Sequence, residues 1–272
     1  MGPRHAVRPA VGRTHRGDFD VDAADRQVAL RLAARGGQRG GAPGARFSGA
    51  QRLARGVTVC VALLGGSFDP VHHGHVKLAA LFSALLLPSE LRIVPAGSPW
   101  QKNRLQASAE QRIAMLELAF GEAALEVTID CQEVTRAAPT YTIDTLRCVR
   151  AELGPNASIV FLMGADQLCQ LDSWHDWRQL FEFAHIAVAA RPGFALADAA
   201  LPGAVAQEIA TRQGSLEQLR TTPSGRVFLA EALAVDISAT QIRAALQRGE
   251  QANSLISPVV LDYIQQHNLY KI

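Results

Sequence analysis

Short apolar runs alternate with amphipathic runs along most of the chain, beginning at Val57. Six apolar runs have the length and composition of buried strands, and we expect strands near residues 57–64, 90–95, 125–130, 158–163, 185–190 and 226–230. Helices are expected in most of the gaps. Because strands and helices alternate, the pattern predicts right-handed βαβ units and an α/β fold, a Rossmann-like doubly wound parallel sheet with flanking helices.

Several helix boundaries carry local signals. Ser108 stands three residues before Gln111, the spacing of a capping box, so a helix is expected to begin there. Gly154, followed by a proline, is expected to end the helix before it. Ser257 and Pro258 are expected to supply the cap and the first residue of the last helix.

Residues 1–56 differ from the rest of the chain. They contain eleven arginines, no lysine, four aspartates and ten of the 22 glycines, and little in them suggests a core. We interpret them as a disordered leader rich in Arg, Gly and Ala, translated from a start codon set too far upstream. An arginine-rich arm that contacts acidic partners and an organelle transit peptide are the alternatives. The domain that carries the function is then residues 57–272.

Charge and cysteine usage narrow the class of protein. Outside the leader, acidic residues outnumber basic ones by 21 to 16, so the basic pI does not indicate nucleic-acid binding. No apolar run approaches the roughly 18–20 residues needed to span a bilayer. None of the four cysteines (Cys60, Cys131, Cys148 and Cys169) forms a C-x-x-C pair. We expect reduced core thiols in a cytoplasmic protein.

The stretch from Gly65 to His75 follows the first apolar run and leads into an amphipathic run. A glycine-rich turn at the carboxyl end of a strand is where open α/β sheets bind ligands. Its two glycines let the backbone approach a ligand, and the helix that follows offers N–H groups to an anion. His72 and His75 are three residues apart and are expected to share a face. Together these features favour binding of a phosphate on which negative charge develops.

A second stretch, from Asp236 to Arg243, has the pattern of a helix start with a cation behind it. Ser238 is expected to cap the helix, which leaves N–H groups near Thr240 available to an anion. Arg243 lies about one turn later and can reach the same anion as a charged donor. An ordinary capped helix with a solvated arginine is the structural alternative.

Other segments carry further candidate ligand contacts. Residues 98–103 contain Lys102 and are either an exposed loop or a mobile lid whose lysine reaches phosphates. Thr142 or Thr140 is expected to cap the helix that follows, whose N–H groups can bind a carboxylate. Asp166, at the end of a predicted strand, either accepts hydrogen bonds from ribose hydroxyls or caps the next helix.

Four motifs resemble those of one family. The run from Gly65 to His75, GGSFDPVHHGH, resembles the GGxFDPxHxGH signature of the nucleotidyltransferase superfamily, and ISATQIR, residues 237–243, is similar to its I-S-x-T-x-I-R signature. Residues 139–146 are similar to the P-S-Y-T-x-x-T-L element of bacterial nicotinate-nucleotide adenylyltransferases. A G-x-D…(P/D)-x-W pattern ends at Trp174. The resemblance covers about residues 57–272, but many relatives have P-P-H-(K/R) where this chain has Pro99-Trp100-Gln101-Lys102.

The resemblance implies adenylyl transfer from ATP to nicotinate mononucleotide, with Mg²⁺ bridging phosphate oxygens and with His72, His75 and Arg243 as the catalytic residues. It implies that ATP is bound by Gly65, Gly66, Ser67, Phe68, His72, His75, Asp166, Ser238, Thr240 and Arg243. It implies that nicotinate mononucleotide is bound by Lys102, Thr142, Ile143, Trp174 and His175. The carboxylate would contact the backbone of Ile143, and the pyridine ring would lie against Trp174, whereas Trp177 is expected to pack in the core.

Three alternatives remain open. The first is transfer of AMP to phosphopantetheine, or of CMP to a polyol phosphate, by a relative that shares H-x-G-H. The second is a sensor that binds NAD-related nucleotides without turnover. The third is a zinc site at His72 and His75, for which the sequence offers no evident third and fourth ligand. We expect no protein metal site, no nucleic-acid partner and no membrane association.

Overall fold

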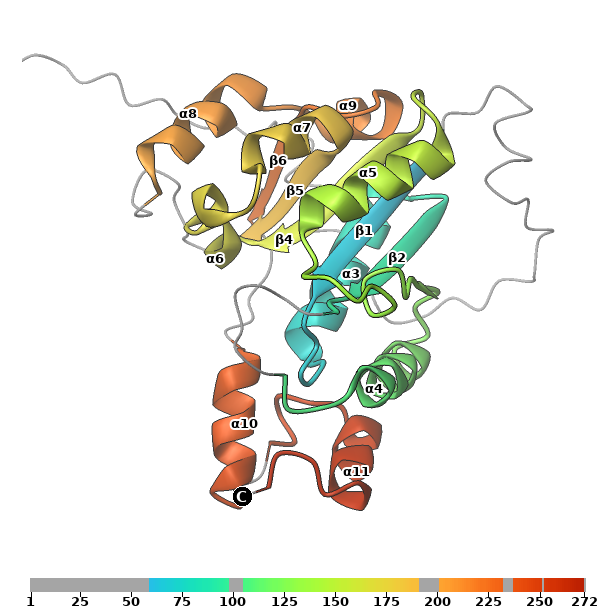
Figure 1. Ribbon diagram of the computed structural model, residues 1–272, viewed down its shortest axis with the longest axis vertical. Helices are drawn as coiled ribbons and strands as arrows, with labels where there is room; N and C mark the ends of the chain where they lie inside the picture. Colours follow the sequence, from blue (N-terminus) through green and yellow to red (C-terminus); the bar gives the residue numbers. More distant parts are fainter. Residues whose placement is uncertain (1–58, 98–104, 191–200, 232–236, 251, 272) are drawn as a thin grey trace, which may run out of the picture.

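The computed structural model describes residues 59–97, 105–190, 201–231, 237–250 and 252–271 (Figure 1). The predicted leader, residues 1–56, and Lys102 lie outside the described residues, so the predictions made for them are not tested. Within the described ranges, no helix is both long enough and apolar enough to cross a membrane.

A single parallel sheet of six strands lies at the centre of the fold, in the order β3-β2-β1-β4-β5-β6. The strands are β1 (Cys60–Gly66), β2 (Glu90–Pro95), β3 (Thr128–Ile129), β4 (Ser158–Gly164), β5 (His185–Ala190) and β6 (Val227–Glu231). The strand order changes direction between β1 and β4, so the carboxyl ends of these two strands flank the switch point, where such sheets bind ligands. The predicted doubly wound fold is confirmed.

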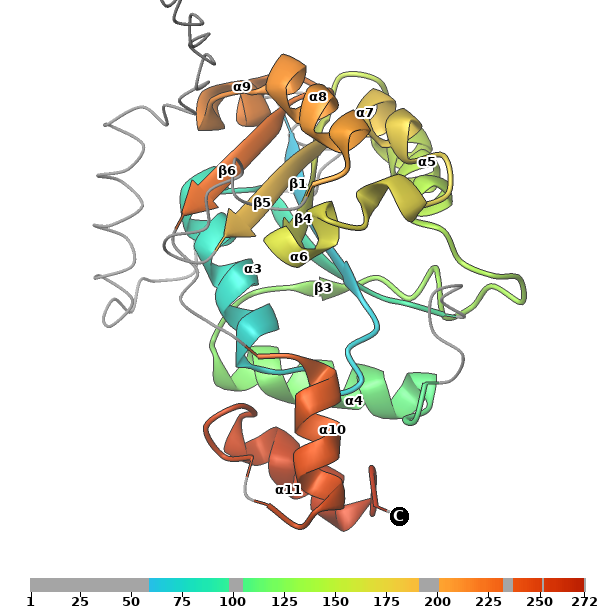
Figure 2. The same cartoon turned by 90° about the vertical axis from the view of Figure 1, so that its left-hand side faces the viewer.

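Helices cover both faces of the sheet (Figures 1 and 2). One face packs against α3 (His73–Leu86), α4 (Ala109–Glu122) and α9 (Leu216–Thr221). The other packs against α5 (Thr142–Leu153), α6 (Ala165–Leu168), α7 (Leu180–Phe183), α8 (Gly203–Arg212) and the 3₁₀ turns η1 (Leu171–Ser173) and η2 (Trp177–Gln179). The last two helices, α10 (Ala239–Gln247) and α11 (Pro258–Gln266), lie together beyond the sheet near α4.

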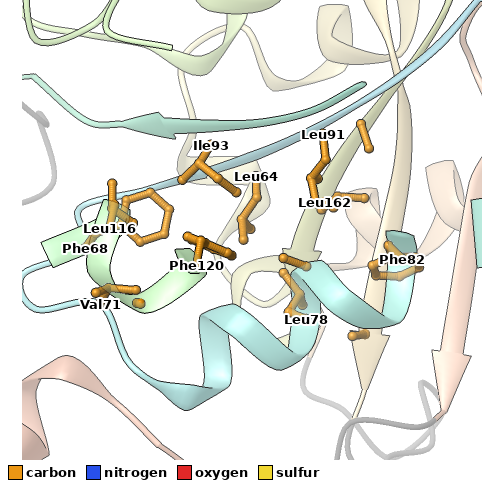
Figure 3. Packing of buried hydrophobic residues seen from close by; sticks show 14 of the residues in the cluster. Leu64, Phe68, Val71, Leu78, Phe82, Leu91, Ile93, Leu116, Phe120 and Leu162 are labelled. Atoms are coloured by element: carbon orange, nitrogen blue, oxygen red, sulfur yellow. The ribbon is translucent and has the colours of Figure 1, made fainter. Parts of the chain in front are cut away.

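Alternate residues of the central strands supply the two cores. In β1, Ala62 and Leu64 face α3 and α4, while Val61 and Leu63 face α5. This is the two-residue period of a strand covered on both faces, which is why β1 reads as a continuous apolar run. Figure 3 shows the first core, where Leu64 packs with Phe120 of α4 and other apolar side chains of the sheet and α3.

The third strand is much shorter than the predicted residues 125–130. Only Thr128 and Ile129 pair with β2. The chain leaves α4 through Ala124, whose φ is 49°, and the N–H of Leu125 still bonds to the carbonyl of Phe120 at 3.2 Å. Residues 125–127 therefore form the connection that follows the end of α4 at Glu122, and they do not pair with the edge of the sheet.

The cysteine prediction is correct only in part. All four cysteines are free thiols. Cys60 is buried, and burial raises the pKa of its thiol. Cys148 is exposed, however, and the remaining two are only half-buried. Cys148 lies on the outer face of α5, because Val149 and Leu146 take up the inner face, so the prediction of four core thiols is wrong.

Candidate functional site

The loop after β1 is shaped by two aromatic rings. A Cβ on Gly65 would lie 3.3 Å from the ring of Phe161, and a Cβ on Gly66 would lie 3.0 Å from the ring of Phe68. Phe68 itself is fully buried in the core below the loop. Internal packing therefore favours glycine at both positions, and a contact from Phe68 to ATP would have to come from its backbone.

The two histidines of the first motif lie at the start of α3. His72 occupies the N-cap position, and its ring stacks on that of His75 with centroids 3.7 Å apart. The backbone N–H of His72 donates to Nδ1 of His75 at 3.3 Å, which leaves the proton of a neutral His75 ring on Nε2. The Phe68 ring meets His75 edge-on at 4.9 Å. The predicted shared face is confirmed.

The second motif lies beside the first. Ser238 caps α10, and its Oγ accepts from the N–H of Gln241 at 3.2 Å, as predicted. Arg243 donates from Nη1 to the backbone carbonyl of Asp69 at 2.6 Å and from Nη2 to Oγ1 of Thr240 at 3.2 Å. One guanidinium therefore joins two motifs that lie 174 residues apart in the sequence.

Asp69 is a buried carboxylate at the centre of this loop. Its oxygens accept hydrogen bonds from the N–H groups of Gln106 (2.8 Å) and Ala107 (3.1 Å) and from the hydroxyl of Tyr270 (2.7 Å). Arg112, only 1% exposed, donates to the carbonyl of Ser67 at 2.9 Å. Burial lowers the pKa of Arg112, and the nearby carboxylate opposes this effect.

The start of α5 differs from the prediction. Its N-cap is Tyr141, whose side chain makes no capping bond, so the prediction that Thr142 or Thr140 caps the helix is wrong. Tyr141 has the extended backbone of an N-cap, whereas Thr140 is buried, and its methyl group would lie 3.1 Å from a Cβ on Gly97. Thr142 and Ile143 still occupy the first helical turn, where backbone N–H groups lack partners within the helix. Since the Ile143 side chain is fully buried, only its backbone can meet a ligand.

Aromatic side chains surround this helix start. The exposed His175 ring lies 4.6 Å from that of Tyr141, which brings two predicted acceptor segments together. Trp174 is half-buried, and its ring meets Phe161 edge-on at 6.1 Å. Its Nε1 atom is buried and has no hydrogen-bond partner among the described residues. Trp177 is 7% exposed and packs on Phe181, as predicted.

Asp166 lies at the carboxyl end of β4, next to the switch point. It is the second residue of α6, and Gly164 takes the N-cap position, so the alternative of a capping aspartate is wrong. Its exposed carboxylate accepts only from Gln167 Nε2, at 2.7 Å, among the described side chains. A role in binding ribose hydroxyls stays a prediction.

Comparison with known proteins identifies the family. A family model described as Cytidylyltransferase-like matches residues 63–245. A protein of Herminiimonas arsenicoxydans named as a probable nicotinate-nucleotide adenylyltransferase is 61% identical over 80% of this chain and 99% of its own length. The chain belongs to the nicotinate-nucleotide adenylyltransferase family. A Laribacter hongkongensis protein with the same name is 47% identical over 78% of this chain and 95% of its own.

Solved structures agree with this family fold. The nicotinic acid mononucleotide adenylyltransferase of Plasmodium falciparum, complexed with NaAD, superimposes with a TM-score of 0.61. It is 21% identical and covers 78% of this chain and 97% of that one. The same enzyme complexed with APC gives a TM-score of 0.58 at 20% identity. Because the sequence identities are this low, the similarity to these solved structures supports the fold alone.

Three residues that shape the candidate site of this adenylyltransferase-family protein were not predicted from its sequence. Phe161 supports Gly65 on one side and Trp174 on the other. Arg112 and Tyr270 donate hydrogen bonds to the loop of the first motif, to the carbonyl of Ser67 and to the carboxylate of Asp69 respectively. Arg112 did leave a signal, because it falls on the same helical stripe as buried Met115 and Leu116, where a charged residue is unexpected. The roles of Phe161 and Tyr270 left no local signal in the sequence.

Proposed function

We propose that the protein transfers the adenylyl group of ATP to nicotinate mononucleotide, releasing pyrophosphate and forming deamido-NAD, at the carboxyl ends of β1 and β4. The observation that supports this most directly is the bond from Arg243 to the carbonyl of Asp69, which joins the H-x-G-H loop to the I-S-x-T-x-I-R helix. The family membership supports the same reaction.

In the proposed reaction, an oxygen of the mononucleotide 5′-phosphate attacks the α-phosphorus of ATP in line. One P–O bond forms, and the bond to the β,γ-pyrophosphate breaks. No covalent intermediate with the protein is required, so catalysis consists of positioning and charge stabilisation. Nε2 of His75 and the ring of His72 donate to the α- and β-phosphate oxygens while charge moves to the leaving group.

The outer phosphates are assigned to the second motif. Arg243, Thr240 and the N-terminus of α10 capped by Ser238 hold the β- and γ-phosphates. Gly65, Gly66 and Ser67 let the nucleotide lie against the backbone, and Asp166 accepts from ribose hydroxyls. Arg243 can exchange its bond to Thr240 for a phosphate oxygen while it keeps its bond to Asp69.

The acceptor is assigned to the start of α5. The N–H of Ile143 and the positive end of the helix bind the nicotinate carboxylate, with Thr142 beside it. The pyridine ring lies against Trp174, next to His175. This arrangement favours the acid over the amide, because nicotinamide mononucleotide has no negative charge at that position. Lys102 is assigned a contact to the phosphate of the mononucleotide.

Mg²⁺ is assigned to the substrates rather than to a protein cage. Within the described ranges there is no group of three or more His, Cys, Asp or Glu side chains that could hold a metal ion. Mg²⁺ accepts a set of water and phosphate ligands, and when bound it neutralises charge on the phosphates. The chain's own contribution is to hold those phosphates in place with Arg243, His72 and His75.

A pyrophosphate-release assay tests the proposal. The purified protein, ATP and Mg²⁺ are incubated with nicotinate mononucleotide, nicotinamide mononucleotide, phosphopantetheine or a polyol phosphate, the last also with CTP. We expect rapid release with nicotinate mononucleotide and formation of deamido-NAD. Faster release with phosphopantetheine or with CTP and a polyol phosphate would assign a different acceptor, and nucleotide binding without release in any arm would indicate a sensor.

A further inference from the structure

Among the described residues, the groups that donate to the carboxylate of Asp69 all lie outside its own motif. It lies between Phe68 and Pro70 and is only 2% exposed. Its hydrogen-bond donors are two backbone N–H groups at residues 106 and 107 and the hydroxyl of Tyr270, which is 201 residues away in the sequence. A buried carboxylate requires such donors, since its loss of hydration is otherwise very unfavourable.

The backbone of the same loop is held by two arginines. Arg112 of α4 donates to the carbonyl of Ser67, and Arg243 of α10 donates to the carbonyl of Asp69. Neither arginine bonds to the Asp69 carboxylate, and Tyr270 is the side chain that does. The three side chains approach the loop from α4, α10 and the segment after α11. His72 follows three residues after Asp69, so this loop sets where α3 and its histidines begin.

The chain takes an unfavourable path to bring Tyr270 to this position. Asn268 and Tyr270 both have left-handed backbone conformations, with φ values of 52° and 60°. A tyrosine rarely adopts this conformation, so the surrounding structure must favour it. The Tyr270 side chain is 5% exposed, and burial and the nearby carboxylate both raise the pKa of its hydroxyl, which keeps it a hydrogen-bond donor at neutral pH.

We propose that Tyr270 is a positioning residue for adenylyl transfer: through Asp69 it fixes the loop that places His72, His75 and Arg243 around the triphosphate. Tyr270 itself contacts no substrate. The inference rests on the proposed function of that site. Because the histidines act on charge that develops in the transition state, a loosened loop should lower kcat more than it raises KM.

The test is a pair of matched substitutions. Tyr270→Phe removes the hydroxyl that binds Asp69, and Tyr263→Phe makes the same chemical change on α11, where the ring packs against His267 at 4.1 Å. We expect Tyr270→Phe to lower kcat by about tenfold, the scale of losing one hydrogen bond to a charged group, with KM for both substrates within about twofold. Tyr263→Phe should keep the wild-type kcat.

A double-mutant cycle identifies the route. If Tyr270 acts through Asp69, Tyr270→Phe combined with Asp69→Asn should lower kcat no further than the more damaging single variant. If the kcat losses of the two single variants multiply in the double variant, the inference is overturned. A Tyr270→Phe kcat equal to that of Tyr263→Phe would overturn it as well. If wild-type protein releases no pyrophosphate in the same assay, the proposed function fails instead.

A second measurement does not depend on the folding of the Phe variant. A 3-fluorotyrosine at position 270 keeps the hydroxyl and nearly the same volume. Its ¹⁹F resonance should move when ATP is added, because the loop that it holds contacts the triphosphate, while a 3-fluorotyrosine at position 263 should not respond. An unchanged resonance at position 270 would contradict the proposed connection between Tyr270 and the nucleotide site.

Discussion

The two ends of the sheet use the same kinds of side chain for different purposes. At the amino end, Arg150 donates to five backbone carbonyls, those of Gly154, Pro155, Ala157, Phe183 and Pro223. These carbonyls lie just before β4, β5 and β6. At the carboxyl end, Arg243 uses one nitrogen for a carbonyl and another for the Thr240 hydroxyl, itself a predicted phosphate ligand. Both terminal nitrogens of the Arg150 guanidinium are engaged by backbone carbonyls, whereas we propose that Arg243 exchanges one partner for substrate.

Histidines show the same contrast. His185, at the amino end, is fully buried, and both ring nitrogens are engaged, Nε2 with the carbonyl of Thr222 at 2.7 Å and Nδ1 with the N–H of Arg226 at 3.0 Å. His75, at the carboxyl end, is half-buried and lies at a helix start. The buried contacts at the amino end serve the fold, whereas the carboxyl end is where we propose that donors meet a ligand.

The largest expected effect concerns His75. We expect His75→Ala to lower kcat by about 10²-fold or more, the scale of losing a preorganised donor, while the melting temperature changes little. Steady-state pyrophosphate release and thermal unfolding measure the two quantities. His267→Ala, on the segment after α11, is the matched control and should keep the wild-type kcat. Near-normal turnover of His75→Ala would show that His75 does not stabilise the transition state.

At the opposite end of the sheet, Arg150→Met should act on stability alone. It leaves several partly buried carbonyls without donors, so we expect the free energy of unfolding in urea to fall by about 2 kcal/mol. The kcat of the folded protein should stay at the wild-type value. Arg248→Met removes an exposed arginine that pairs with Glu250, and this variant should unfold at the same urea concentration as the wild type, because exposed ion pairs contribute little. A loss of kcat in Arg150→Met would break the division between the two ends.

Substrate choice tests the carboxyl end from the acceptor side. We expect kcat/KM for nicotinate mononucleotide to exceed that for nicotinamide mononucleotide by about tenfold or more, because only the acid places a charge at the start of α5. Kinetics with each mononucleotide at saturating ATP measure the ratio. Equal specificity constants would show that the helix start does not select the carboxylate.

The smallest effect is the pH dependence that His185 contributes. Burial lowers the pKa of His185 below its usual value of 6.5. The unfolded chain therefore binds the proton first as the pH falls. The stability contributed by neutral His185 is complete above about pH 6.5 and is lost progressively at lower pH, by at most about 1.4 kcal/mol per pH unit.

His185→Gln should remove that part of the pH dependence. Urea unfolding between pH 7.5 and 5.5 should show a shallower decline than in the wild type, although the variant is less stable at pH 7.5. His175→Gln, which replaces an exposed histidine, should keep the wild-type slope. An unchanged slope in His185→Gln would indicate that other groups control stability in this range.

Local patterns in the sequence were sufficient for the sheet and for the two phosphate motifs. The apolar runs predicted the existence of all six strands and the extent of all but β3, and the spacing from Ser108 and from Ser238 placed two helix starts correctly. Each of these features depends on residues within one turn or one strand of each other. The prediction for Ser257 was right in position, although its Oγ makes no capping bond.

Features that depend on distant parts of the chain could not be read in this way. The cap of α5 was misplaced because Thr140 turns inward against Gly97, a contact between two segments more than forty residues apart. The bond from Tyr270 to Asp69 spans 201 residues, and nothing in the sequence around either residue indicates it. The extent of β3 also depended on how α4 ends, which a run of apolar residues does not reveal.

The position of Phe161 has a consequence for how such a site can change over evolution. Its ring touches residues of both proposed binding regions, since it lies against the Cβ position of Gly65 and edge-on to Trp174. A methyl group added at position 65 would crowd this ring, and any shift of the ring would be passed on to the indole that it touches. If the proposed sites are correct, substitutions beside the nucleotide would also alter the surface offered to the pyridine ring, and new acceptor preferences could arise without any change in the residues that touch the acceptor.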